Sequence, residues 1–236
     1  MKKIVLLFAL ISISIFSNAQ SKKIKEGVAE FDVSYPHLTA QMKQMESSLP
    51  QTMTIYFKNN QNRIEMSTVV GSTYIISDNT KKEISVLMDM MSQKIAIKQT
   101  QEEITKKEAE LKKSGNMPTF KIVESKETKI IAGYKCKKVI VEYTLDGKKE
   151  QMTCFYTDAL PQINTGTDNL ALNEIKGFLM EYNITQSGIQ MKIVAKEIKA
   201  QKIDDQLFSI PADYKIMTQD EITEMMKGMG KSTDTK

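Results

Sequence analysis

The sequence has no tryptophan, a single histidine and two cysteines, and these shortages remove several classes of site. His37 has no cysteine or second histidine near it, so a zinc site of the usual kind cannot be built around it. The sequence also lacks a G-x-S-x-G elbow, an H-E-x-x-H pair, a glycine-rich phosphate loop and a G-x-G-x-x-G turn. We therefore expect no metal, no cofactor and no enzymatic activity, although carboxylates paired only by folding would leave no trace here. His37 is interpreted as an ordinary loop or helix-entry residue.

Concentrated charge and linker-like composition are absent as well. The lysines are spread along the chain, and no basic block is interleaved with aromatic residues, which argues against a nucleic-acid partner. The formal charge of +4 falls to about +2 (4 − 2) once Lys2 and Lys3 are removed with the first segment. Because no Pro/Gly/Ser-rich linker or internal repeat divides the chain, we expect one domain over residues 20–228 and a disordered tail over 229–236.

The first 19 residues have the pattern of a secretory signal peptide. Two lysines precede an apolar run from Ile4 to Phe16, and small residues follow at Ser17 and Ala19. The alternative is a membrane anchor, but the run is shorter than the roughly 20 residues needed to cross a bilayer. We expect cleavage near Ala19 and a periplasmic or secreted protein that is not integral to the membrane.

Apolar and polar residues alternate with a period of two through most of the remaining chain, which is typical of half-buried strands. Turn signals such as Asp146-Gly147 separate the strands, and residues 161–173 are predicted to form a polar loop. About ten or eleven strands are enough for a strongly curved antiparallel sheet or an open barrel. The predicted strands are 29–35, 52–57, 63–66, 73–77, 83–88, 94–98, 119–124, 134–144, 149–157, 178–185 and 189–198.

Two or three helices interrupt the strands. Leu38, Met42, Met45 and Leu49 recur at helical spacing and predict an amphipathic helix between Pro36 and Pro50. A second helix is predicted over residues 100–113, where Thr100 and Glu103 form a capping box. A third is predicted to begin at Thr218, with Glu221 as its box partner.

The two cysteines lie on the two arms of the predicted Asp146-Gly147 hairpin. A disulfide between Cys136 and Cys154 is one alternative, since an exported protein meets oxidising conditions. A tight turn, however, would place Cys136 opposite Thr157 and Cys154 opposite Val139, which is too far to bridge. Two buried free thiols are the other alternative, and the sequence leaves both open.

Methionine is abundant, with 16 residues against 8 phenylalanines, and many lie on apolar faces. Thioether side chains repack easily, so this composition fits an adaptable cavity for flexible apolar ligands. Ordinary filling of the core explains any single methionine equally well.

Several segments resemble a known family. They are residues 53–65 (MTIYFKNNQNRIE), 73–88, 132–137 (AGYKCK), 155–158 (FYTD) and 207–214 (LFSIPADY). Together they resemble the DUF4412 family, a secreted family of unknown function in Bacteroidota, which is similar to the lipoprotein carriers LolA and LolB. The resemblance implies a mainly β (α+β) half-barrel, with two or three helices plugging or lidding a concave apolar face that takes up acyl chains. Arg63 lies where those carriers often have a strand arginine.

The hypothesis that follows is a non-enzymatic periplasmic protein that carries or senses lipid or lipoprotein acyl chains. The alternative is an envelope interaction or structural module without a small-molecule ligand, which would have an envelope protein as partner. An unrecognised hydrolase is the third reading and would need titratable groups converging in one cleft. The predicted groove residues are Phe31, Val33, Leu38, Met42, Met45, Met53, Ile55, Phe57, Ile64, Met66, Met191 and Ile193.

Overall fold

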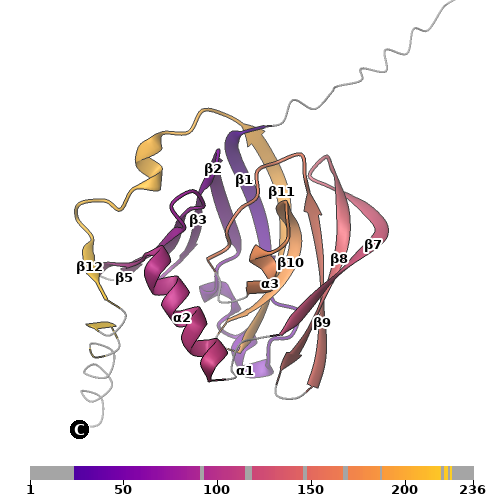
Figure 1. Cartoon of the computed structure of the whole chain (residues 1–236), viewed down its shortest axis with the longest axis horizontal. Coiled ribbons are helices and arrows are strands. Elements are labelled where there is room, and N and C mark those ends of the chain that lie inside the picture. The colour runs from indigo at the N-terminus through magenta and orange to yellow at the C-terminus, as the bar shows by residue number, and fades with distance from the viewer. Residues whose placement is uncertain are drawn as a thin grey trace, which may run out of the picture.

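The computed structural model describes residues 24–90, 93–114, 119–145, 148–166, 170–186, 188–218, 221–222 and 224. Its main element is a single twelve-stranded sheet, curved and not closed, with the strand order β12-β6-β5-β4-β3-β2-β1-β11-β10-β9-β8-β7 (Figure 1). The strands are β1 (Glu26–Ser34), β2 (Thr52–Lys58), β3 (Gln61–Thr68), β4 (Gly71–Asp78), β5 (Glu83–Met90), β6 (Gln93–Gln99), β7 (Phe120–Ile131), β8 (Tyr134–Leu145), β9 (Lys148–Thr157), β10 (Phe178–Gln186), β11 (Ile189–Ala200) and β12 (Lys215–Met217).

Two antiparallel meanders make up the sheet, and β1 joins them. Strands β2 to β6 follow one another on one side of β1, and strands β11 back to β7 follow on the other. The eleven predicted strands are all present, and most lie close to their predicted bounds; β7, predicted to end at Glu124, continues to Ile131. The twelfth, β12, was missed because it is only three residues long. It also pairs in parallel with β6, which is distant in sequence, so no hairpin turn in the sequence indicates the pairing.

The alternating pattern decides which side chains face the inside of the curve. On β2, Met53, Ile55 and Phe57 point inward and are buried. The inner row that begins at Ile55 continues through Ile64, Ile75, Val86 and Ile97 on the next four strands. A parallel inner row runs through Met53, Met66, Thr73, Met88 and Ile95.

The inside of the curve next to β1, β2 and β7–β11 is filled by residues 160–166 and 170–175, which we call the plug. It contains the short helix α3 (Leu170–Asn173), which lies within the curve in Figure 1. The sequence predicted a polar loop over 161–173, and this was wrong in one respect: Leu160, Ile163, Ala171, Leu172 and Ile175 are buried in the main apolar cluster. These apolar residues lie among polar ones without a strand or helix period, so their burial was not predicted.

Residues 203–214 cover the outer face of β3–β6. The 3₁₀ helix η2 (Asp205–Phe208) brings Ile203 and Phe208 against Ile76, Leu87 and Ala96. Arg63 is buried there: its Nε atom lies 2.6 Å from Glu65 Oε1, and its Nη1 donates to the carbonyl of Leu207 at 3.2 Å. Arg63 therefore anchors the C-terminal segment on the outside of the sheet.

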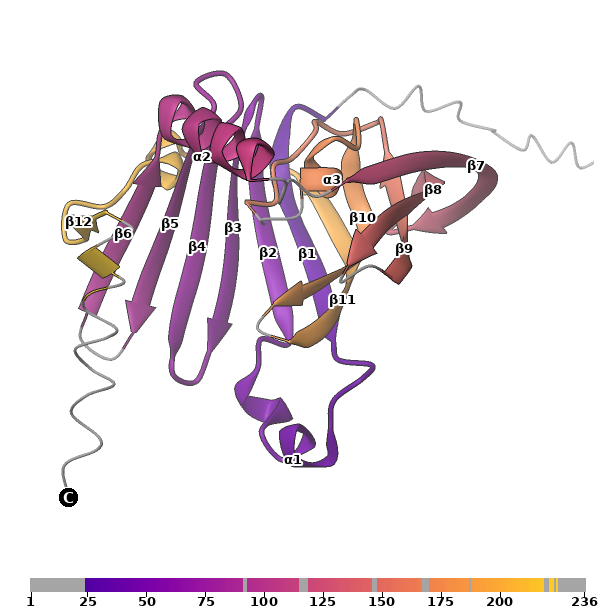
Figure 2. The same ribbon diagram turned by 60° about the horizontal axis from the view of Figure 1, so that its bottom comes forward.

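The helix α2 (Gln101–Lys113) connects β6 to β7 and crosses in front of the inner face of β3–β6 (Figure 2). Thr100 and Glu103 form the predicted capping box, so this helix and its start are confirmed. Figure 2 also shows the excursion between β1 and β2, which extends beyond the end of the sheet. Across the described ranges, every helix is too short or too polar to traverse a bilayer.

The helix predicted between Pro36 and Pro50 was wrong. That excursion holds only the four-residue helix α1 (Ala40–Lys43) and the 3₁₀ turn η1 (Glu46–Ser48). Gln51 donates from Nε2 to the carbonyls of Glu46 and Leu49 and so stabilises the tighter turn. Because the excursion projects beyond the sheet, its apolar face has little surface to pack against, and Met45 is exposed.

The predictions at the two ends of the chain fall mostly outside the described residues. These include the signal segment 1–19 and the tail 229–236. Thr218 and Glu221 form the predicted capping box, and residues 221, 222 and 224 are helical.

Candidate functional site

The inner face of the sheet changes character from β3 to β6. Near β1 and β2 the plug buries the inward side chains completely, whereas Met66, Val86, Met88 and Ile97 remain partly exposed. Ile84, also inward, is partly exposed too and packs against the edge of the main cluster. This part of the inner face, which we call the uncovered strip, is apolar and lies beyond the plug; at its far edge Met88 and Ile97 pack against a small cluster of Ile95, Met217 and Ile222.

A cleft of about 250 Å³ lies at one end of this strip. Met66 and Thr73 join it to the strip, because both belong to the second inner row. None of the side chains around the cleft is an acid, a lysine or an arginine. The residues that line it are Tyr35, Leu49, Pro50, Met66, Thr68, Val70, Gly71, Ser72, Thr73, Met90, Ile189 and Met191.

Tyr35 shapes one wall of the cleft. Its hydroxyl donates to the carbonyl of Pro50 at 2.6 Å and so ties the end of β1 to the start of β2. Burial, with a smaller contribution from the charge of Glu46, raises the pKa of Tyr35 above its usual value. The phenol therefore stays a neutral donor, and the cleft carries no charge at neutral pH.

The plug borders the strip on its other side and is held by polar contacts. Asn62 on β3 is buried and hydrogen bonded to the backbone of Asn164. Asn173 accepts at Oδ1 from the backbone N–H of Thr165, at 3.2 Å. The hydroxyl of Ser77, buried on β4 beside Asn62, has no hydrogen-bond partner among the described residues. The buried hydroxyl of Ser77 therefore lies where the plug meets the uncovered strip, without a partner in the described part of the chain.

The helix α2 lies in front of the strip without close packing. Ile104 and Leu111 are partly buried, but they belong to none of the apolar clusters among the described residues. Lysines and glutamates occupy most of the remaining helical positions. The helix is stabilised by its own capping box more than by the sheet.

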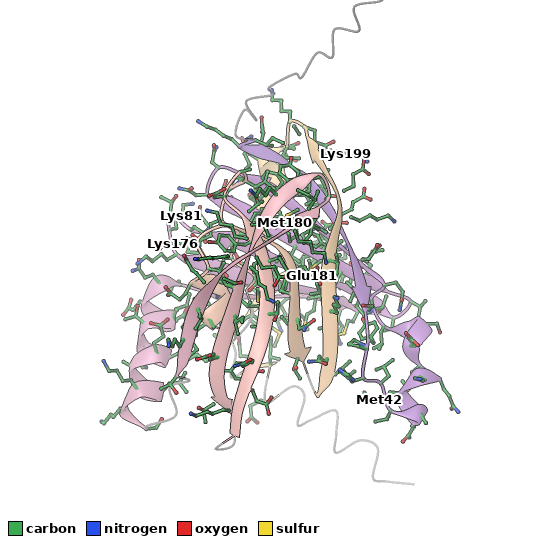
Figure 3. All side chains as sticks on the ribbon, turned by 90° about the vertical axis from the view of Figure 1, so that its right-hand side faces the viewer. Met42, Lys81, Lys176, Met180, Glu181 and Lys199 are labelled. Carbon is green, nitrogen blue, oxygen red and sulfur yellow. The ribbon has the colours of Figure 1, made fainter. Side chains whose placement is uncertain are left out.

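The predicted groove residues divide into three groups. Only Met66 and Met191 line the cleft. Leu38 is partly buried against the main cluster, and Met42 and Met45 lie on the excursion, where Figure 3 shows Met42 away from the body of the sheet. The others face inward but are buried beneath or beside the plug: Phe31, Val33, Met53, Ile55, Phe57, Ile64 and Ile193.

Sequence reasoning did not assign Val70 or Met90 to the groove. Val69-Val70 is an apolar pair between two predicted strands, at a place where polar turn residues are usual, and this was the signal available. Leu49, Pro50 and Ile189 also line the cleft, and only the fold brings them there.

The cysteines are free thiols, so the disulfide alternative was wrong. Cys154 pairs with Val139 on β8, and Lys137 pairs with Tyr156, which is the register of a tight hairpin. Cys136 therefore lies three positions along the strand from the partner that a cross-strand bond would need. Both thiols are buried within the main cluster and do not reach the cleft.

Charged side chains elsewhere in the described part of the chain are the alternative to the cleft as a candidate site. Within the described residues, no three His, Cys, Asp or Glu side chains are grouped as metal ligands would be. A larger hollow of about 510 Å³ lies at the ends of β7–β9, but Lys121, Glu142, Lys149 and Glu150 give it a charged lining. The 250 Å³ cleft is the better candidate because it is apolar and continuous with the uncovered strip.

The comparisons with known proteins give a family of unknown function and a likeness of fold. Residues 39–214 match DUF4412, a domain of unknown function. No curated protein matches the sequence significantly. The chain resembles the crystal structure of PNGF-II with a TM-score of 0.51 and 12% identity, covering 86% of this chain and 33% of PNGF-II. This chain thus spans about a third of PNGF-II, and at this identity the likeness extends to the fold alone.

Two further structures are more distant. A β-barrel-like DUF1849 protein from Brucella abortus gives a TM-score of 0.37 at 7% identity, covering 76% of this chain and 99% of that one. LprF from Mycobacterium bovis gives 0.31 at 15% identity, covering 83% and 93% of the two chains.

Proposed function

The chain belongs to the DUF4412 family of domains of unknown function, and on that premise we propose that it binds the acyl chain of a lipid or lipoprotein in an apolar groove. The groove comprises the cleft and the uncovered strip of the inner face. In this proposal the open sheet acts as a half-barrel, α2 as its lid, and the protein works outside the cytoplasm as a carrier or sensor. The signal-like first segment supports that location.

The observation that carries the proposal is the incomplete cover of the inner face. A fully packed protein would bury Met66, Val86, Met88 and Ile97, yet all four stay partly exposed between the plug and the small cluster of Ile95, Met217 and Ile222. Soluble proteins rarely leave a continuous apolar surface without a use for it. Methionine side chains at this surface suit a flexible ligand, because thioethers adapt their packing.

The dimensions of the cleft suit a narrow ligand. Its volume of about 250 Å³ lies just below the roughly 300–1,000 Å³ usual for small-molecule sites. Each buried methylene of an acyl chain contributes about 0.8 kcal/mol, so a short length of chain supplies useful affinity without polar contacts. Outward movement of α2 would lengthen the groove along the strip, and its loose packing supports that movement.

We also infer that the protein is not an enzyme. The groove offers no nucleophile beside a base, and the tyrosine at its wall is a neutral structural donor. Substrate turnover would require groups that the lining does not contain.

Fatty-acid binding tests the proposal directly. Organic-solvent extraction of the purified protein should release lipid, and the delipidated protein should take up a fluorescent fatty acid. Met66→Lys places a charge at the edge of the cleft and should weaken uptake about tenfold or more. Its matched control is Ser67→Lys, the next residue on the outer face, which should bind as the unaltered protein does.

Both variants should remain folded, because Met66 is partly exposed and a lysine there can extend its ammonium group to water. Absence of extractable lipid together with absence of uptake would contradict the proposal.

The second candidate is an envelope interaction module without a small-molecule ligand. The plug favours it, because it fills half of the inner face with the protein's own side chains. If another protein covers the strip, neither the unaltered protein nor any variant should take up fatty acid. Met66→Lys should then abolish capture of that protein.

A further inference from the structure

The cleft opens beside three exposed apolar side chains. Val69 and Val70 form the two-residue loop of the β3–β4 hairpin, and their side chains are 81% and 57% exposed. Met90, at the end of β5, pairs with Gly71 and is 48% exposed. We call Val69, Val70 and Met90 the apolar tip; Val70 and Met90 also line the cleft.

The turn itself gives no reason for two valines. Two-residue hairpin loops favour Asn-Gly or Asp-Gly, which accept positive φ angles, and β-branched residues suit them poorly. Neither valine has a positive φ. Thr68 closes the loop instead: its Oγ1 donates to the carbonyl of Gly71 at 3.1 Å and accepts from the N–H of Val70 at 3.2 Å. The valines therefore serve something other than formation of the hairpin.

The opposite end of the same strands shows what turns of this sheet ordinarily contain. The β2–β3 loop is Asn59-Asn60, and the β4–β5 loop runs from Asn79 to Lys82 with polar and charged residues throughout. Because the strands are antiparallel, these loops lie at the far end from the apolar tip. Among the turns of this meander, those at one end are thus polar and the β3–β4 turn at the other end is apolar, as a turn positioned at a boundary between water and an apolar phase would be.

Composition and charge identify the apolar phase. Residues 66–73 contain no charged residue, and Lys94, close in sequence to Met90, is paired with Asp89 at 3.6 Å and Asp213 at 2.8 Å. An uncharged surface of this kind does not select anionic lipids, which are attracted by unpaired lysines and arginines. The tip also lacks the tryptophan, tyrosine and arginine that supply most energy at protein interfaces, where valine is under-represented.

We propose that the apolar tip inserts into the surface of a zwitterionic phospholipid bilayer and holds the mouth of the cleft against it. The inference deepens the proposed function, on which it rests: a chain leaving the bilayer enters the cleft between Val70 and Met90 without crossing water. Nothing in the tip depends on ion pairing, so the contact is insensitive to salt.

The absence of tryptophan permits a clean fluorescence test. Val69→Trp places one reporter on the tip, and Asn60→Trp places one on the polar loop at the opposite end. With phosphatidylcholine vesicles, we expect the Val69→Trp emission to shift to the blue and to be quenched by brominated acyl chains. The Asn60→Trp emission should not change. Equal behaviour of the two reporters would overturn the inference.

The double variant Val69→Asn/Val70→Gly supplies the second measurement. Asn-Gly favours a two-residue hairpin turn, so the fold should be retained while the apolar contact is lost. We expect vesicle partitioning to fall about tenfold or more, by the transfer free energy of two aliphatic side chains. Ile130→Asn removes a side chain of β7 that is 66% exposed, between the values for Val69 and Val70, and should leave partitioning unchanged.

Fatty-acid uptake without vesicles separates this inference from the proposed function. Uptake with no partitioning to phosphatidylcholine vesicles would overturn the inference alone. Partitioning that requires anionic lipid and disappears at high salt would overturn it too. Self-association that the double variant abolishes would show that a second copy covers the tip. Tip-dependent vesicle insertion with no fatty-acid uptake would overturn the proposed function instead.

Discussion

Asn62 and Asn164 exchange two hydrogen bonds in the interior of the protein. The Nδ2 atom of Asn62 donates to the carbonyl of Asn164 at 2.9 Å, and the backbone N–H of Asn164 donates to Asn62 Oδ1 at 3.0 Å. A side chain on β3 thereby satisfies both backbone groups of a residue in the plug, 102 positions along the chain. This pair holds the plug against β3.

Asn62→Ala should destabilise the protein by about 2 kcal/mol, because the buried Asn62 side chain is lost and both backbone groups of Asn164 lose their partner. Chemical denaturation gives the free energy of unfolding. Asn60→Ala, in the exposed turn two residues earlier, is the control and should change stability little. If Asn62→Ala were as stable as the control, the plug would not depend on this pair.

Gly166 forms a second contact between the plug and the sheet, against Ile75 on β4. Its φ is +61°, and a Cβ atom there would lie 2.3 Å from Cγ2 of Ile75. Gly188 also has a positive φ, of +78°, with nothing within 4 Å of a Cβ. Gly188→Ala should therefore cost about 1 kcal/mol for the left-handed backbone alone, and Gly166→Ala about 1–3 kcal/mol more for the overlap with Ile75.

A double-mutant cycle isolates that overlap. Ile75→Ala removes the side chain that the new methyl group would meet, so Gly166→Ala should be less harmful in its presence than alone. Purely additive effects on the free energy of unfolding would show that the plug does not press against β4.

The carboxyl group of Glu181 makes the free energy of unfolding depend on pH in the acid range. Burial acts to raise the pKa of its carboxyl, but Lys129 Nζ at 2.5 Å and Lys192 Nζ at 2.9 Å outweigh burial and hold the pKa below the usual 4.5. A depressed pKa in the folded state stabilises it above the pKa of the unfolded state, near 4.5, and this contribution is lost as the pH falls through the folded value. Figure 3 shows Glu181 on the central part of the sheet, next to the buried Met180.

Glu181→Gln should therefore lower the free energy of unfolding at pH 7, and the deficit should shrink as the pH falls below about 4.5. Unfolding curves over a pH series measure it. Glu197→Gln, at an exposed ion pair with Lys199, is the control and should give a small difference at every pH. A deficit for Glu181→Gln that stayed constant through the acid range would argue against the ion-pair origin.

The two thiols should be unreactive until the protein unfolds. Burial raises the pKa of Cys136 to about 11 and that of Cys154 to about 12, so few thiolates form at neutral pH. Thiol-reactive reagents should label neither residue in the native protein and both in denaturant. Mass spectrometry of the unreduced protein should count two thiols, and a mass lower by two hydrogens would reveal a disulfide.

Local sequence predicted the strands well because a strand's period depends only on neighbouring residues. The alternation in residues 52–57 and 63–66 placed β2 and β3, and the capping box at Thr100 placed the start of α2. Even the hairpin register that keeps Cys136 and Cys154 apart followed from the tight-turn count. The helix predicted over Leu38–Leu49 failed since spacing alone does not supply a surface on which an amphipathic face can pack.

The residues of the candidate site were predicted less well from the sequence than the strands were. Of the predicted groove residues, Met66 and Met191 line the cleft, whereas Phe57 and Ile193 lie in the plugged part of the interior. Alternation of apolar and polar residues distinguishes inward from outward side chains of a strand. It does not distinguish a plugged inward side chain from an uncovered one. The boundary between plugged and uncovered positions depends on the plug, whose apolar side chains follow no period.

The sequence by itself determined the strands of the sheet in all but the shortest, and the alternation that sets which side chains face inward. Only the tertiary structure decided which inward side chains stay partly exposed, because that depends on where the plug and α2 lie. Contacts such as Asn62 with Asn164 join positions far apart in the chain, and a local pattern of residues carries no record of them.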